Sequence, residues 1–172
     1  MPPSPKLTAP QILDLPPRKM AVVTTVGEPG AEVERVMKGL FGAAYTIKFA
    51  RKKQGLAEYK VECPRARWPN AHEAPKDQWI GIWGLPVPDD VTELPQKEPG
   101  IEVKLDTWEY GTVAQVLHIG PYSEEGPTVA RLHEFIEEQG YELAGPHEEE
   151  YQTRPTAKVM KTVIRYEVRK RG

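Results

Sequence analysis

Glu149 and Tyr151 are the residues of this 172-residue chain whose types and spacing best suit chemistry. Side chains two residues apart in a β-strand point to the same face, so both would face one side while Glu148 and Glu150 face the other. A carboxylate can act as a general acid or base, and a tyrosine hydroxyl can donate a hydrogen bond to a carbonyl oxygen or orient water. The alternative is a solvated acidic strand with a packed tyrosine.

A second group that could contact a ligand consists of Trp68, Trp79 and Trp83. Trp79 and Trp83 share strand parity, with Gly81 between them, which predicts a flat apolar surface with a gap at its centre. A planar aromatic ligand could stack on such a surface. Large aromatic residues are also ordinary in protein cores and barrel walls, so packing is the alternative.

Three tyrosines are further candidates for ligand contact, namely Tyr45, Tyr110 and Tyr122. Tyr45 lies beside Phe41 and Lys48 on a predicted helix and flanks its apolar stripe, a place from which it could cap a pocket. Tyr122 follows a Gly-Pro turn and could instead only fix the start of the next helix. Packing is the alternative for all three.

The sequence predicts no metal, cofactor or phosphate site. The four histidines lack metal-ligand spacing, and residues 147–150 do not form the two-histidine helical pattern of a zinc protease. Gly81 and Gly84 are not a phosphate loop, because no Lys-Ser/Thr pair follows them. The histidines are His72, His118, His133 and His147.

The composition limits which kinds of partner and which cell compartment are expected for this chain. With 23 basic and 25 acidic residues the formal net charge is −2, so there is no broad basic field and no nucleic acid partner is expected. Cys63 is the only cysteine, which excludes an internal disulfide and favours a reducing compartment. Without a secretory leader or an apolar membrane span, a cytoplasmic protein is predicted. Its oligomeric state stays open between a monomer and a small homo-oligomer.

The elements that must position these residues are indicated by local patterns. Residues 1–19 are rich in proline, which cannot donate a ladder hydrogen bond, so a tail or an edge segment is expected. The β-branched stretch Met20–Val26 predicts a buried strand that ends in a turn at Gly27. Apolar residues at three- and four-residue steps then predict a helix over about 31–52. Two strands complete this half, over about 58–68 and 79–85.

The second half of the chain follows a proline-rich connector over about 86–105. Gly111–Ile119 predicts a strand that ends at Gly120, and an apolar stripe from Val129 to Ile136 predicts a helix. Two more strands are predicted, near 141–152 and 159–169.

The order of elements in the two halves is the same, and Val22–Gly27 can be laid on Gln115–Gly120 at a constant offset. This indicates an internal duplication. A single strand-helix-strand-strand unit would expose one face of its sheet, so two units are expected to pair about a pseudo-twofold axis. The predicted fold class is α+β, with one domain over 20–172 made of repeats at about 20–85 and 107–170.

Five stretches of the chain also match the pattern of a known family: AYTIKFARKKQG at 44–55, WIGIWGLPVPDDVT at 79–92, VAQVLHIGPYSEEGPTVARLHEFIEEQGYE at 113–142, EEEYQTRP at 148–155 and KTVIRYEV at 161–168. They resemble the GyrI-like small-molecule-binding, or effector-binding domain, family. The resemblance covers nearly the whole chain past residue 16, and the second-half stretches are the more specific.

This resemblance implies a duplicated antiparallel sheet curved into a partly closed barrel, with the pocket where the two repeats meet. It aligns Glu149 with an acidic residue that meets cationic or polar ligands in the pocket of the drug-binding relatives. In an aromatic pocket of low dielectric the pKa of that carboxyl is expected to rise. The stretch Pro64–Trp68 departs from the Leu-Glu-Gly-Leu-Trp pattern of many stand-alone members, so the role of that first-half glutamate does not carry over.

Two functions stay open from the sequence. One is a hydrolase of cyclopropane-bearing, planar, genotoxic natural products, acting in detoxification, in which Glu149 assists the addition of water and Tyr151 stabilises charge on the conjugated carbonyl. The other is a multidrug-binding or sequestering module that binds amphipathic or cationic ligands without turnover. Family members of both kinds exist, so the fold alone does not decide between them.

Overall fold

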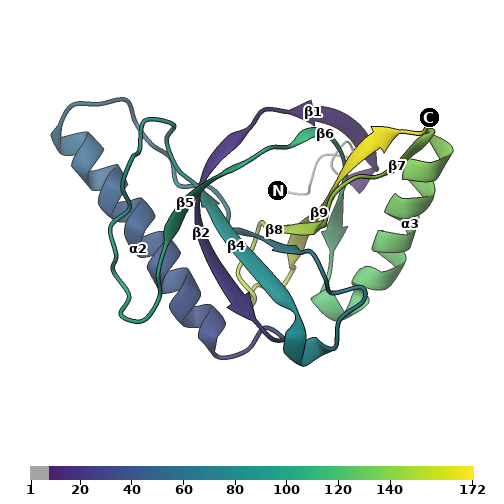
Figure 1. The fold of residues 1–172 in the computed structure, drawn as a ribbon, viewed down its shortest axis with the longest axis horizontal. Coiled ribbons are helices and arrows are strands. Elements are labelled where there is room, and N and C mark those ends of the chain that lie inside the picture. Colours follow the sequence, from purple (N-terminus) through teal and green to yellow (C-terminus); the bar gives the residue numbers. More distant parts are fainter. Residues whose placement is uncertain (1–7) are drawn as a thin grey trace. The chain divides into compact units, whose positions relative to one another are not determined.

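The computed structural model describes residues 8–172 and divides into two compact units. The first unit is Pro17–Glu109, and the second unit is Tyr110–Gly172 together with the residues up to Pro16. Each unit consists of antiparallel strands and a helix, which confirms the predicted α+β class (Figure 1). The first seven residues of the predicted proline-rich segment lie outside the described part of the chain.

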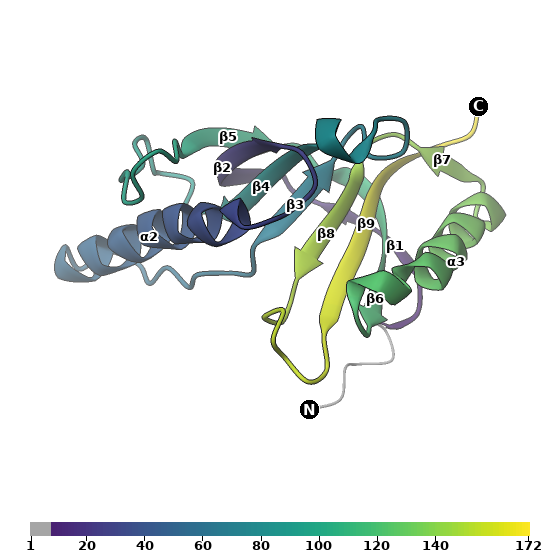
Figure 2. The same cartoon turned by 90° about the horizontal axis from the view of Figure 1, so that it is seen from below.

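The first unit has a four-stranded antiparallel sheet in the order β3-β4-β2-β5. Helix α2, Glu32–Lys53, packs against β2 and β4 (Figure 2). Its buried residues Val36, Leu40 and Ile47 lie three to four positions apart and form the predicted apolar stripe. The strands are β2 (Arg18–Val26), β3 (Arg65–Trp68), β4 (Ile80–Pro86) and β5 (Lys104–Trp108).

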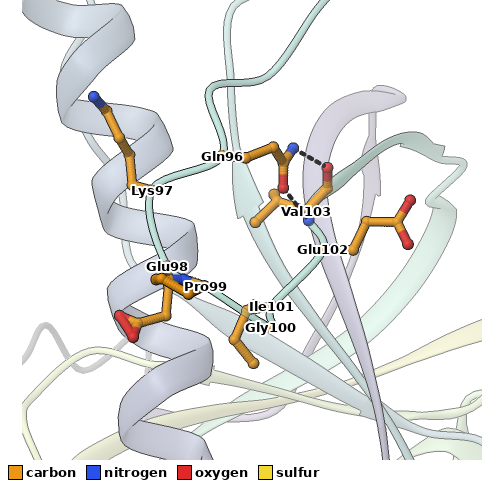
Figure 3. Close-up of a pocket in the computed structure, with 8 residues that line it drawn as sticks. All are labelled: Gln96, Lys97, Glu98, Pro99, Gly100, Ile101, Glu102 and Val103. Atoms are coloured by element: carbon orange, nitrogen blue, oxygen red, sulfur yellow. Dashed lines mark hydrogen bonds between the residues drawn. The ribbon is translucent and has the colours of Figure 1, made fainter.

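A loop over Gln96–Val103 lies beside α2 and lines an open hollow of about 610 Å³ (Figure 3). The side chain of Gln96 closes this loop by two hydrogen bonds with the backbone of Val103, at 2.8 and 3.0 Å. A Cβ atom on Gly39 of α2 would lie 2.9 Å from Ile101 Cγ2, so glycine there lets the loop approach the helix. None of the candidate site residues lines this hollow.

The second unit has a sheet in the order β1-β6-β9-β8, with β7 also paired to β9. Helix α3, Glu125–Glu138, contacts β6 and β7 and buries Leu132 and Ile136 in a core with Ile164 and Tyr166. The strands are β1 (Gln11–Leu15), β6 (Gly111–Ile119), β7 (Tyr141–Leu143), β8 (His147–Tyr151) and β9 (Lys161–Lys170).

The predicted internal repeat is visible at its two glycine turns. Gly27 and Gly120 have φ angles of +104° and +130°, a region that favours glycine. The backbone N–H of Gly27 donates to the carbonyl of Trp79 at 2.7 Å, and that of Gly120 donates to the carbonyl of Met160 at 2.9 Å. Equivalent residues therefore close equivalent strands in both units.

The strand before each repeat pairs with the other repeat. β1 precedes β2 in the chain but pairs with β6 of the second unit, and β5 precedes β6 but pairs with β2 of the first unit. Local sequence patterns do not predict this exchange, because they carry no information on strand partners.

Two predicted strands are shorter than expected. Only Arg65–Trp68 of the stretch 58–68 is a strand, since the preceding residues are held by side chains and Pro64 has no N–H to donate. There the Tyr59 hydroxyl donates to the carbonyl of Pro86 at 2.6 Å. The stretch 141–152 is interrupted over 144–146, where the N–H of Ala144 donates to the carbonyl of Glu167 at 2.8 Å. No helix among residues 8–172 has the length and apolar character needed to cross a membrane.

Candidate functional site

Strand β8 presents two different faces, as the alternation of its side chains predicts. His147, Glu149 and Tyr151 interact with one another on one face. Glu148 and Glu150 lie on the other face, where both contact Arg165 of β9. The predicted sharing of one face by Glu149 and Tyr151 is confirmed, and the solvated acidic strand is excluded because β8 is buried or half-buried throughout.

The face of Glu148 is a buried ion-pair network. Arg165 Nη1 lies 2.6 Å from Glu148 Oε2, and its Nε donates to Gln115 Oε1 at 2.8 Å. The Tyr110 hydroxyl donates to the same oxygen of Glu148 at 3.0 Å. Tyr110 is therefore placed among buried structural partners and not beside Glu149.

The face of Glu149 is a hydrogen-bonded chain of four side chains. The hydroxyl of Tyr151 donates to Glu149 Oε1 at 3.0 Å, and His147 Nε2 lies 2.9 Å from Glu149 Oε2. The other ring nitrogen of His147, Nδ1, lies 2.6 Å from the hydroxyl of Tyr166. Both oxygens of the Glu149 carboxylate are thus held in place from β8 itself.

Glu125, the first residue of α3, joins this chain from a second element. Its side chain is buried, with 9% of the residue exposed, and its Oε1 has no hydrogen-bond partner within residues 8–172. One carboxylate oxygen of Glu125, one ring nitrogen of His147 and one oxygen of Glu149 all lie within 4.8 Å of one another. We refer to Glu125, His147 and Glu149 as the carboxylate–histidine cluster.

The two carboxyl groups of the cluster titrate in opposite directions. Burial, followed by the neighbouring Glu149, raises the pKa of Glu125 well above its ordinary value. Burial also acts to raise the pKa of Glu149, but hydrogen bonds with His147 and Glu125 outweigh it and lower the pKa. The expectation of a raised pKa for Glu149 is therefore wrong, because that expectation included burial but not the polar partners.

Aromatic rings surround the cluster. The ring of Tyr122 meets that of Tyr151 edge to face, with centroids 5.8 Å apart, and 40% of Tyr122 is exposed. The ring of Tyr166 contacts His147 and His133, at 5.2 and 4.9 Å between centroids. Burial raises the pKa of both Tyr122 and Tyr166, with the charge of Glu149 as the next cause. The rings thus border the ionised carboxylate.

The tryptophans come together in the first unit. Trp68 meets Trp83 and Trp79 edge to face, with centroid distances of 5.4 and 6.2 Å. The predicted gap over Gly81 is filled, since a Cβ atom there would lie 2.9 Å from Trp68 Cζ3 and 3.0 Å from Trp83 Nε1. Trp83 also donates from Nε1 to Thr25 Oγ1 at 3.0 Å. The expected flat surface with a central gap is wrong, because Trp68 packs into the space that glycine leaves.

Tyr45 lies on the exposed side of α2. Its ring stacks between Phe41 and Phe49, at centroid distances of 6.3 and 6.2 Å, and 44% of the residue is exposed. It flanks the apolar stripe as predicted. The structure thus gathers Glu149, Tyr151 and Tyr122 in the second unit and the three tryptophans in the first, and a shared pocket stays a prediction.

Sequence reasoning missed His147, Glu125 and Tyr166. His147 could have been found, because the strand parity that links Glu149 to Tyr151 also includes the residue two positions earlier. Glu125 and Tyr166 gave no such signal, since they lie on α3 and β9, and local patterns do not show which residues of other elements lie beside β8.

The comparisons with known proteins agree with this fold. Residues 8–168 match the model of the GyrI-like small molecule binding domain. No curated protein matches the chain. An uncharacterized conserved protein from Listeria innocua is 29% identical, with 94% of this chain and 93% of that one covered and a TM-score of 0.82. A hydrolase from Listeria innocua is 28% identical, with 94% and 92% covered and a TM-score of 0.80.

A more distant structure shares the fold alone. The C-terminal domain of EcmrR is 12% identical, with 95% of this chain and 98% of that one covered and a TM-score of 0.61. The family model spans almost all of the described residues and both units. The chain belongs to the GyrI-like small-molecule-binding domain family.

Proposed function

We propose that this small-molecule-binding domain is a hydrolase of planar, electrophilic aromatic compounds that carry a strained cyclopropane ring. The observation that carries the proposal is the half-buried carboxylate of Glu149, kept ionised and fixed in orientation by His147 and Tyr151. The similarity to a Listeria innocua hydrolase over nearly the full length supports it.

Glu149 is suited to position and activate water. The two oxygens of the carboxylate offer about four acceptor sites, and hydrogen bonds with Tyr151, His147 and Glu125 occupy three of them, so one is left for a water molecule. Fixing the carboxylate before the reaction avoids the cost of ordering it in the transition state.

The reaction follows from the strain of the substrate. The oxygen of water attacks the ring methylene carbon while Glu149 accepts one of its protons. The strained carbon–carbon bond breaks, and its electron pair moves through the conjugated system to the carbonyl oxygen. That oxygen takes a proton from solvent and becomes a phenol, and Glu149 returns its proton to solvent. No oxidant or reductant is needed.

Tyr151 acts as a positioning residue in this proposal. Its hydroxyl donates to Glu149 Oε1, so that proton is not available to a substrate carbonyl. The exposed ring of Tyr122, edge-on to Tyr151, is available to contact a flat ligand.

A second candidate function is binding without turnover. The same tyrosine rings beside an ionised carboxylate would attract a lipophilic cation by charge and by the ring faces. Isothermal titration calorimetry with such a cation measures this binding, and mass spectrometry of the recovered ligand shows whether it was changed.

The test of the hydrolase proposal is consumption of a cyclopropane-bearing planar compound by purified protein, followed by mass spectrometry for the water adduct. We expect Glu149→Gln to lower the rate by roughly 100-fold or more, because a positioned general base contributes about that factor. Glu134→Gln, on the exposed side of α3, is the matched control and should keep the parent rate. Equal rates for the two variants, or no adduct with the parent protein, would refute the proposal.

A further inference from the structure

The carboxylate–histidine cluster consists of three groups that all offer lone pairs to the same small volume. One oxygen each from Glu125 and Glu149 and one nitrogen from His147 lie within 4.8 Å of one another. The closest pair, His147 Nε2 and Glu149 Oε2, is 2.9 Å apart. Ligand atoms about 2.0–2.2 Å from one ion lie roughly 3–4 Å apart, so a small rotation of Glu125 would complete such a set.

Glu125 supplies an independent sign that a partner belongs at this place. Only 9% of the residue is exposed, and its buried Oε1 has no hydrogen-bond partner in the described part of the chain. A buried carboxylate oxygen without a partner is costly and rare in native proteins. Something that the protein chain itself does not provide therefore fits beside this oxygen.

The charge around the cluster indicates what that partner is. Across residues 8–172, neither Glu125 nor Glu149 forms an ion pair with a lysine or an arginine. A buried and a half-buried carboxylate side by side repel each other unless a proton or a cation lies between them. A divalent cation would neutralise both groups and would also satisfy the free oxygen of Glu125.

The surrounding contacts are those that support metal ligands. A ligating histidine usually uses its other ring nitrogen in a hydrogen bond that fixes the ring. Here His147 Nδ1 lies 2.6 Å from the Tyr166 hydroxyl, which leaves Nε2 facing Glu149. A ligating carboxylate is usually hydrogen-bonded as well, and Tyr151 donates to Glu149 Oε1.

We propose that Glu125, His147 and Glu149 bind one divalent transition-metal ion of the Zn²⁺ or Mn²⁺ kind. One imidazole and two carboxylates suit these borderline ions, and three protein ligands leave a coordination position for water or a small molecule. The site departs from the sequence-based expectation of no metal, because its third ligand comes from a distant helix and not from a local spacing pattern. The proposal does not depend on the hydrolase function.

The test measures metal uptake directly. EDTA-treated, desalted full-length protein is titrated with ZnCl₂ and with MnCl₂ by isothermal titration calorimetry, and bound metal is counted by mass spectrometry after dialysis. We expect one ion per chain for at least one of the two metals, and a rise in the melting temperature on binding. Glu125→Gln and His147→Gln should each weaken binding by about 10-fold or more.

Matched controls separate a site from surface binding. Glu134→Gln and His72→Gln change exposed residues of the same types and should bind as the parent does. Tyr166→Phe removes only the hydrogen bond to His147, and we expect a loss of roughly 10- to 100-fold in affinity. Circular dichroism spectra and melting curves recorded without metal show whether each variant is folded.

Two results would overturn the proposal. One is the absence of uptake of either metal by folded parent protein, which would leave a shared proton between the two carboxyl groups as the occupant. The other is uptake that is unchanged in folded Glu125→Gln and His147→Gln. Because the readout is metal binding, a protein that hydrolyses nothing can still confirm the site, and an active protein can still refute it.

Discussion

The helix of each unit begins with a glutamate, but the two glutamates have different surroundings. α2 begins at Glu32 and α3 begins at Glu125, and in both cases the helix follows a strand that ends in a glycine turn. A glutamate in the first turn is favoured in any helix because it faces the positive end of the helix dipole. Glu32 is half-buried, whereas Glu125 is buried against Glu149 and His147.

The partner strands explain this difference. In the first unit, β3 has the sequence RARW and contributes Trp68 to an aromatic cluster. In the second unit, β8 has the sequence HEEEY and contributes acids and a histidine. The comparison teaches that a glutamate at a helix start belongs to a polar site only in the unit whose strand β8 supplies polar partners.

The largest expected effect tests whether the second unit depends on its buried charges. Arg165→Met breaks the buried ion pair between Arg165 and Glu148, and breaking a buried ion pair costs about 3–5 kcal/mol of unfolding free energy. Urea denaturation measures the loss. Arg169→Met breaks an exposed ion pair with Glu142 and should cost less than about 1 kcal/mol. If the two variants lose similar amounts of unfolding free energy, the buried ion pair contributes no more to stability than the exposed one.

The next effect tests whether Tyr151 orients Glu149. Tyr151→Phe removes a hydrogen bond to a charged group, worth about 1.5–3 kcal/mol, so we expect roughly a 10- to 100-fold fall in turnover of the cyclopropane compound. Substrate affinity should change little, since the ring is retained. Tyr45→Phe, in the exposed stack of α2, should leave turnover unchanged. If turnover falls in Tyr45→Phe and not in Tyr151→Phe, the catalytic residues lie in the first unit and the proposal for Tyr151 is wrong.

A smaller effect tests whether the tryptophans of the first unit are tightly packed. Gly81→Ala places a Cβ atom 2.7 Å from Thr25 Oγ1 and 2.9 Å from Trp68 Cζ3, and we expect a destabilisation of about 1–3 kcal/mol. Gly126→Ala in α3, where no atom lies within 4 Å of the new Cβ, should be neutral or slightly stabilising. Unfolding curves of the two variants measure the difference in stability. If Gly81→Ala is as stable as the parent protein, the space over Gly81 is open after all, as the sequence predicted.

The smallest effect concerns the exposed aromatic stack of α2. Phe49→Ala removes the ring contact between Phe49 and Tyr45. Side-chain pairs of this kind on a helix surface contribute about 0.2–0.5 kcal/mol to helix stability. A stability loss of that size in chemical denaturation, with unchanged turnover, is the expected result. A loss of ligand binding instead would assign the stack a direct role.

The parts of the fold that were predictable depend on local patterns. The strand Gly111–Ile119 and the helix Glu32–Lys53 follow from β-branched runs and from three- and four-residue spacing. Residues 58–64 have the same composition as a strand but are held by side chains such as Tyr59, and no local pattern distinguishes the two states. Strand pairing, by contrast, is decided between distant segments.

The features of the site also divide into those that a local pattern predicts and those that depend on distant segments. Glu149 and Tyr151 were predictable as a pair because strand geometry alone places them on one face. The lowered pKa of Glu149 was missed because it follows first from the hydrogen bond with His147, a residue that was not considered together with Glu149 and Tyr151, and then from Glu125 of another element. The prediction of a gap between the tryptophans was wrong for a related reason. Strand parity relates Trp79 to Trp83, but it does not show that Trp68 packs over Gly81.

The exchange of β1 and β5 between the repeats has a consequence for how the chain folds. The first unit is complete once residue 109 has been synthesised, because β5 lies before that point. β1 must wait much longer, since its partner β6 begins at Gly111 and the rest of that sheet follows to Lys170. Closing so long a loop is entropically costly and slows folding. The earliest strand of the chain is therefore expected to be among the last to find its place, because the second unit, unlike the first, is built from two separate segments of the chain.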